Sequence, residues 1–77
     1  MPRYFFNVRT RDHVIDDGEG SYLADLASAR SEAMDVAAVL IEESIKAVGT
    51  VDRRDAVEVT DELGERVLTV LFGDVMH

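Results

Sequence analysis

Residues 23–48 read LADLASARSEAMDVAAVLIEESIKAV, and this stretch decides the fold. Apolar residues recur in it every three or four positions, which is the period of an α-helix. Asp25 can cap the first turn, because its carboxylate accepts hydrogen bonds from the free N–H groups there. Lys46 suits the helix dipole in the last turn, and Gly49 suits the left-handed position that follows a helix. We expect one helix of about 23 residues, which is roughly 34 Å long.

One stripe of this helix should face a core. It consists of Leu26, Ala29, Ala33, Val36, Ala37, Leu40, Ser44 and Val48. Ser44 is its polar member, and we expect its hydroxyl to bond the carbonyl oxygen four residues back. A six-residue strand spans only about 20 Å, so the helix should extend beyond the sheet that it covers.

Strands are predicted on both sides of the helix. Residues 3–9 are aromatic and β-branched, and residues 13–16 can pair back on them as a short second strand. Residues 17–21 are rich in turn formers and predict a loop.

The segment after the helix predicts a second hairpin. Residues 56–60 alternate between apolar and polar, and residues 66–72 form an apolar final strand. The connection 61–64 ends in Gly64, which tolerates a positive φ. Residues from Gly73 onward are expected to be a tail.

These elements predict one α+β domain that spans residues 1–77. Its order is hairpin, helix, hairpin (ββαββ), with four strands in one antiparallel sheet and the helix packed on one face. The two hairpins can join through the first and last strands or through the second and third. The more apolar first and last strands favour the former.

The apolar surface exceeds what one helix on one sheet face can bury. Apolar residues cover an arc of about 200° on the helix, whereas packing on a single sheet needs somewhat more than about 100°. The final strand is apolar on both faces as well. We therefore expect a homodimer, or docking onto another protein. The expected surface consists of Phe5, Ala27, Met34, Ala38, Ile41, Ile45, Val67 and Leu71.

The charge excludes some partners and admits others. Sixteen acidic and eight basic residues give a net charge of −8. Phosphate backbones and anionic lipids repel such a chain, so we expect neither nucleic acid nor a membrane as a partner. The charge favours solubility, and it is also what a protein that masks a basic partner would carry.

Few residues suggest a catalytic or metal-binding role. The chain has no Cys, which excludes cysteine nucleophiles and disulfides. His13 lies among the carboxylates Asp12, Asp16, Asp17 and Glu19, but their spacing does not match a calcium loop. We predict no catalytic residue, no metal site and no cofactor, and a structural or solvated role for this cluster.

Arg30 and the loop 52–55 hold three of the seven arginines of the chain. Arg30 projects into the apolar arc of the helix. Its guanidinium either reaches the acidic loop 16–19 or contacts an anion or a partner's carboxylate. The loop 52–55 contains two arginines and two aspartates, and it is interpreted as near neutral rather than as a basic patch.

Four segments carry a resemblance to a known family. They are MPRYFFNVR at 1–9, DDGEG at 16–20, LADLASARSEA at 23–33 and VEVTDELG at 57–64. In this order they resemble a family of small alphaproteobacterial proteins, notably from rhizobia, that form a domain of unknown function. The resemblance implies a bacterial source and a compact stand-alone protein. It implies no activity, cofactor or catalytic residue.

Our leading functional expectation is a non-enzymatic protein-interaction module that forms a homodimer. The alternative is an acidic regulator, antitoxin-like or a nucleic-acid mimic, that binds a basic protein. A small enzyme or ligand binder would need a pocket lined by His13, Arg30 and the carboxylates of 16–19. The lack of Cys and of an apolar leader at the N-terminus predicts a cytoplasmic location.

Overall fold

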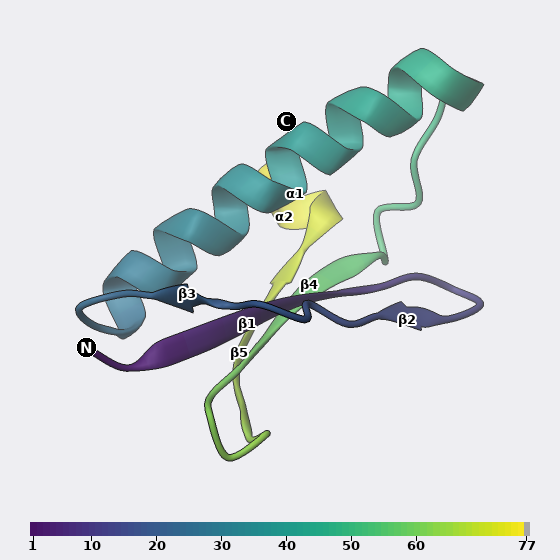
Figure 1. Ribbon diagram of the computed structural model, residues 1–77. Coiled ribbons are helices and arrows are strands. Elements are labelled where there is room, and N and C mark those ends of the chain that lie inside the picture. Colours follow the sequence, from purple (N-terminus) through teal and green to yellow (C-terminus); the bar gives the residue numbers. More distant parts are fainter. Residues whose placement is uncertain (77) are drawn as a thin grey trace.

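The computed structural model describes residues 1–76, in which one long helix lies across an antiparallel sheet (Figure 1). In chain order the elements are β1 (Arg3–Arg9), β2 (Val14–Ile15), β3 (Ser21–Tyr22), α1 (Leu26–Val48), β4 (Ala56–Thr60), β5 (Arg66–Leu71) and α2 (Phe72–Val75). The predicted α+β class is confirmed, as is the packing of a single long helix on one face of the sheet.

Both ends of α1 are capped as the sequence predicts. The Asp25 carboxylate accepts a hydrogen bond from the Ser28 N–H at 2.8 Å. Gly49 adopts φ of 82°, and its N–H donates to the Ile45 carbonyl oxygen at 2.8 Å. A left-handed residue here satisfies a free carbonyl and turns the chain away, which is why glycine is favoured.

The prediction for Ser44 is wrong. Its hydroxyl donates to the carbonyl oxygen of Thr50 at 2.8 Å, not to the carbonyl four residues back. After Gly49 the chain folds back past the last helical turns and offers a carbonyl that no helical N–H occupies. Ser44 therefore fixes the path of the segment that leaves the helix.

The strand order, which the sequence leaves undetermined, differs from both of the expected joins. The sheet runs β2-β1-β4-β5, with β3 paired to the same side of β1 as β2. The two halves thus join through β1 and β4, where Phe6 lies opposite Val59. The reason is burial: Ala56, Val57 and Val59 of β4 have no exposed surface, which is typical of a central strand. On β5, by contrast, Leu71 is 39% exposed, which suits an edge.

The return strand of the first hairpin is interrupted, whereas the sequence predicts one continuous short strand. It is split into β2 and β3, so the described part of the chain has five strands instead of four. Both pieces have two residues, and β3 occupies the end of the predicted loop. Gly20 permits the approach of β3 to β1, because a Cβ there would lie 2.8 Å from the Tyr4 carbonyl oxygen.

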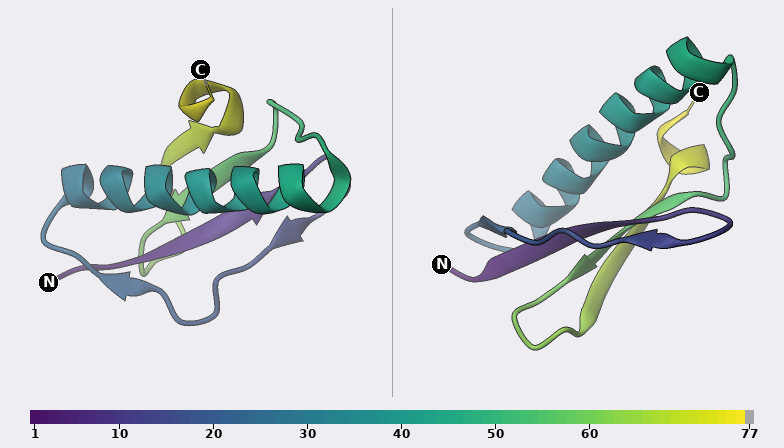
Figure 2. Two further views of the ribbon diagram at one scale, coloured as in Figure 1. Left: turned by 90° about the horizontal axis from the view of Figure 1, so that it is seen from above. Right: turned by 45° about the vertical axis from the view of Figure 1, so that its right-hand side comes forward.

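The expected C-terminal tail is a packed element in the described residues. Phe72 is 3% exposed, and α2 begins there and lies beside α1 on the side away from β2 and β3 (Figure 2). The Phe72 N–H donates to the Asp55 carbonyl oxygen at 2.8 Å, and the Gly73 N–H donates to that of Arg53 at 2.9 Å. These bonds tie α2 to the loop before β4. His77, also part of the predicted tail, lies outside the described residues.

The core lies between α1 and the sheet and depends on three alanines. Ala29, Ala33 and Ala37 have no exposed surface, and Ile41 continues their line at 9% exposure. They are spaced by four residues and form one ridge, which packs on Val57 and Val59 of β4. Small side chains let the helix lie close to the strand. The ends of the predicted stripe, Leu26 and Val48, remain 46% and 71% exposed because the helix extends beyond the sheet.

Substitution of the middle alanine tests this close contact. Ala33→Leu should lower the free energy of unfolding by about 1–3 kcal/mol, because the added methyl groups have no space. Ala47→Leu is the matched control: Ala47 is exposed on the same helix, and its effect should stay within about 0.5 kcal/mol. Urea denaturation of both variants measures this difference, and equal stability would refute the close contact.

Candidate interaction surface

The structure divides the eight residues that were predicted to form a partner surface. Ile41 belongs to the core. Val67 sits at a register shift, with Leu68 opposite Val59 and Arg66 opposite Thr60, and its side chain packs against the core. Phe5 is half-buried, and the Arg3 guanidinium lies 5.0 Å from its ring centre. The other five are exposed: Ala27, Met34, Ala38, Ile45 and Leu71.

Four of these exposed residues lie on one side of α1, which we call the A27–I45 face. They are Ala27, Met34, Ala38 and Ile45, separated by seven, four and seven residues. This spacing keeps side chains on one side of a helix. Met34 is 39% exposed and Ile45 is 46% exposed, so the apolar surface is open to solvent.

The other side of α1 has a shallow groove that our sequence reasoning missed. Its volume is about 310 Å³, and Val36, Val39 and Leu40 line it together with Glu32 and Asp35. The partner surface expected from the sequence does not include Val39. The signal was present, because the three apolar residues have the spacing i, i+3, i+4 of neighbours on a helix.

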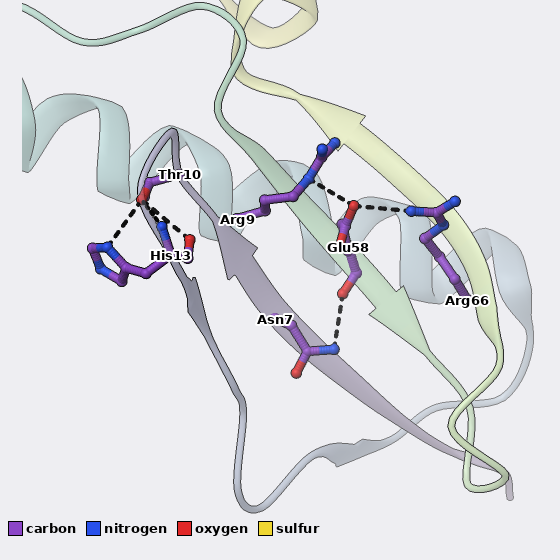
Figure 3. Close-up of polar contacts among 6 residues, drawn as sticks. All are labelled: Asn7, Arg9, Thr10, His13, Glu58 and Arg66. Carbon is purple, nitrogen blue, oxygen red and sulfur yellow. Dashed lines mark hydrogen bonds and ion pairs between the residues drawn. The ribbon is translucent and has the colours of Figure 1, made fainter.

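The middle of the sheet face turned away from α1 is polar, whereas Phe5 and Leu71 lie toward the two ends of this face. Glu58 of β4 lies between two arginines (Figure 3): its Oε2 is 2.8 Å from Arg9 Nε and 3.1 Å from Arg66 Nη1. Asn7 Nδ2 donates to the Glu58 carbonyl oxygen at 3.3 Å. Only 14% of the Glu58 side chain is exposed, so this cross-strand group occupies the middle of the face.

His13 lies in the tight turn that joins β1 to β2. The His13 Nδ1 lies 3.4 Å from Thr10 Oγ1, and the Thr10 N–H donates to the His13 carbonyl oxygen at 2.9 Å (Figure 3). Within residues 1–76 no group of three or more His, Asp or Glu residues gathers as metal ligands would. His13 thus belongs to a tight turn.

Asp17 has a structural role between β2 and β3. Its carboxylate accepts N–H bonds from Phe6, Glu19 and Gly20, each at 3.1 Å. Its own N–H donates to Asn7 Oδ1 at 2.9 Å. Partial burial raises the pKa of Asp17, but the N–H groups of Phe6, Gly20 and Glu19 together outweigh it and hold the pKa below 3.8.

Arg30 is exposed on α1. Within residues 1–76 it forms no ion pair, so the expected contact with the acidic loop 16–19 is not made there. Neither the groove above nor a cleft at the β1–β2 turn is lined by His13 or Arg30.

The fold and this surface define a small α+β protein whose one long helix covers an antiparallel sheet and keeps an apolar side open. No helix within residues 1–76 combines the length and the apolar character that crossing a membrane requires. A family model, Domain of unknown function (DUF6894), matches residues 3–73, and the chain belongs to this family. No curated protein and no solved structure matches the chain.

Removing the Asp17 charge should weaken the fold. Ionised Asp17 has a lowered pKa in the folded state, so its contribution is complete well above pH 3.8 and is lost as the pH falls through the folded-state value. Asp17→Asn should cost about 1–3 kcal/mol at pH 7 and flatten the loss of stability below about pH 4.

Asp16→Asn is the control, because Asp16 is the exposed neighbour in the same loop. Its effect at pH 7 should stay within about 0.5 kcal/mol. Denaturation curves from pH 3 to pH 7 measure both quantities. Equal acid sensitivity of wild type and Asp17→Asn would contradict the role of Asp17.

Proposed function

We propose that this protein is a non-enzymatic interaction module that works as a homodimer, and that two copies join through the A27–I45 face. The observation that carries the proposal is the exposed apolar side of α1. Met34 and Ile45 are long side chains with 39% and 46% of their surface open, and both lie on this face. Burying apolar surface of this kind favours association.

The order of large and small residues on this face suits a second copy. In an antiparallel pair of identical helices, a two-fold axis level with Val36 places Met34 opposite Ala38 of the second copy. The same axis places Ala27 opposite Ile45 of the second copy. Each long side chain then meets an alanine, so that ridges enter grooves on both helices.

The other surfaces offer less to a second copy. The open sheet face has Glu58 and two arginines at its centre, and the arginine side chains are 47% and 61% exposed, so a second copy would have to remove water from these charges. The groove at Val39 is apolar, but Glu32 and Asp35 line it, and two copies would bring these like charges together.

No observation favours the acidic regulator. Its acidic residues would gather on one exposed surface. In the described part of the chain they are spread over the connection from β1 to β3, the outer side of α1 and the turn between β4 and β5. The non-enzymatic part of the proposal rests on the lack of Cys and on the binding of the His13 ring to a turn hydroxyl.

Sedimentation velocity at about 100 μM tests the dimer. The wild type should sediment at twice 8.5 kDa, and Met34→Glu should sediment as a monomer, because a charge at the two-fold contact cannot be desolvated. Higher salt should strengthen the dimer, because each copy carries −8. Circular dichroism checks that the variant keeps its helix.

Val39→Glu is the matched control. Val39 is 56% exposed on the other side of the same helix, so this variant should remain a dimer. A wild type that stays at 8.5 kDa, or a dimer lost in Val39→Glu and kept in Met34→Glu, would refute the proposal.

A further inference from the structure

A cleft of about 240 Å³ opens between the turn after β1 and the loop before β4. Its lining residues are all polar or charged: Arg9, Thr10, Arg11, Asp52, Arg54 and Asp55. Three of the seven arginines of the chain meet here with two aspartates. The cleft therefore has a formal charge of +1 in a protein of net charge −8.

The pairing of β1 with β4 builds this cleft. The two strands are antiparallel, and Arg9 lies opposite Ala56. The residues that follow Arg9 thus run beside those that precede Ala56, although about 40 positions separate them in the sequence. Taken alone, the loop 52–55 is predicted to be near neutral. The cleft has an excess of positive charge because Arg9 and Arg11 lie beside this loop.

Both walls of the cleft are held by hydrogen bonds. On one side, the Thr10 N–H and the Thr10 hydroxyl both donate to the His13 carbonyl oxygen, at 2.9 and 3.2 Å. On the other side, the Asp55 N–H donates to the Asp52 carbonyl oxygen at 3.1 Å, and the Asp55 carbonyl oxygen accepts from Phe72 at 2.8 Å. A ligand would therefore meet groups that are already positioned.

The guanidinium groups differ in how much of their hydrogen-bonding capacity is used. The Arg54 guanidinium donates to the Asp52 carboxylate through two hydrogen bonds, with Nε 3.2 Å from Oδ1 and Nη2 3.2 Å from Oδ2. Arg9 is fixed through Nε to Glu58 at 2.8 Å, and its two terminal nitrogens point away from that carboxylate (Figure 3). Arg11 forms no ion pair within residues 1–76. Arg9 and Arg11 thus supply free donors at the cleft.

We propose that this cleft binds the phosphate group of a small molecule between the guanidinium of Arg11 and the terminal nitrogens of Arg9. A phosphate has three acceptor oxygens and a charge near −2, so it engages both arginines. A carboxylate has two oxygens and a single charge, so it gains less from the two arginines than a phosphate does. The proposal concerns a different surface from the A27–I45 face and does not depend on dimer formation.

The charge of Asp55 weakens anion binding and makes the proposal testable in both directions. Burial raises the pKa of Asp55, and the negative charge of Asp52 raises it further, whereas the Arg11 backbone N–H and the Arg54 charge lower it. In its ionised form Asp55 repels an anion. Its removal should therefore strengthen binding, while removal of the Arg11 charge should weaken it.

Titration of the full ¹⁵N-labelled chain with inorganic phosphate at pH 7 and constant ionic strength tests the site. The backbone amide signals of Arg11 and Arg54 should shift and saturate at millimolar phosphate. Arg11→Gln should raise the midpoint about ten-fold, and Asp55→Asn should lower it several-fold. Acetate should bind at least about ten-fold more weakly than phosphate.

Arg30→Gln is the control, because Arg30 is an exposed arginine on α1 outside the cleft. It should leave the midpoint unchanged. Shifts that rise linearly without saturation in the wild type would overturn the proposal. So would an unchanged midpoint in an Arg11→Gln protein with an otherwise native spectrum, and equal affinity for acetate would overturn the choice of phosphate.

Discussion

The contact of three alanines with the central strand is the constraint on which the rest of the structure depends. Ala29, Ala33 and Ala37 are fully buried against β4, whose Val57 and Val59 are buried as well. Small side chains keep the helix close to the sheet, so the core between them is thin. A thin core covers only a narrow stripe of a 23-residue helix. The remaining apolar side chains of that helix therefore lie outside the core, and the A27–I45 face is a direct consequence.

The same central strand positions the polar parts of the molecule. On the face away from the helix, Glu58 of β4 holds Arg9 and Arg66 of the two neighbouring strands. At the start of β4, its register with β1 brings Arg11 beside the loop 52–55 and forms the cleft. Fold and candidate sites thus share one cause, which is the burial of β4 between β1 and β5.

What the sequence predicted well depended on neighbouring residues. The helix and its caps follow from signals within a few positions, at Asp25 and Gly49, and both are found where expected. The turn at Asp61–Gly64 is likewise local: the Asp61 carboxylate accepts from Leu63 and Glu65 at 2.9 Å. Interactions of this kind join residues a few positions apart, so the pattern of neighbouring residues indicates them directly.

What the sequence failed to predict depended on residues far apart. The strand order could not be derived from how apolar each strand is, because both β4 and β5 carry valines. The short helix α2 needs the carbonyl oxygens of Arg53 and Asp55, which lie about 20 positions earlier. The loop 52–55 has no net charge when it is taken alone, so the positive charge of the cleft could not be predicted from it. The apolar excess of the helix was visible in its periodicity, although Ile41 proved to belong to the core.

The central claim is that the open side of the helix meets the same side of a second copy in an antiparallel arrangement. Ala27 and Ile45 are 18 residues apart on one helix, about 27 Å, so their methyl groups cannot touch within a chain. Nuclear Overhauser spectroscopy on the methyl-labelled protein at dimer-forming concentration measures this contact directly. The account predicts a cross-peak between the Ala27 and Ile45 methyl groups, which must arise between two chains. Its absence from a sample that sediments as a dimer would contradict the account.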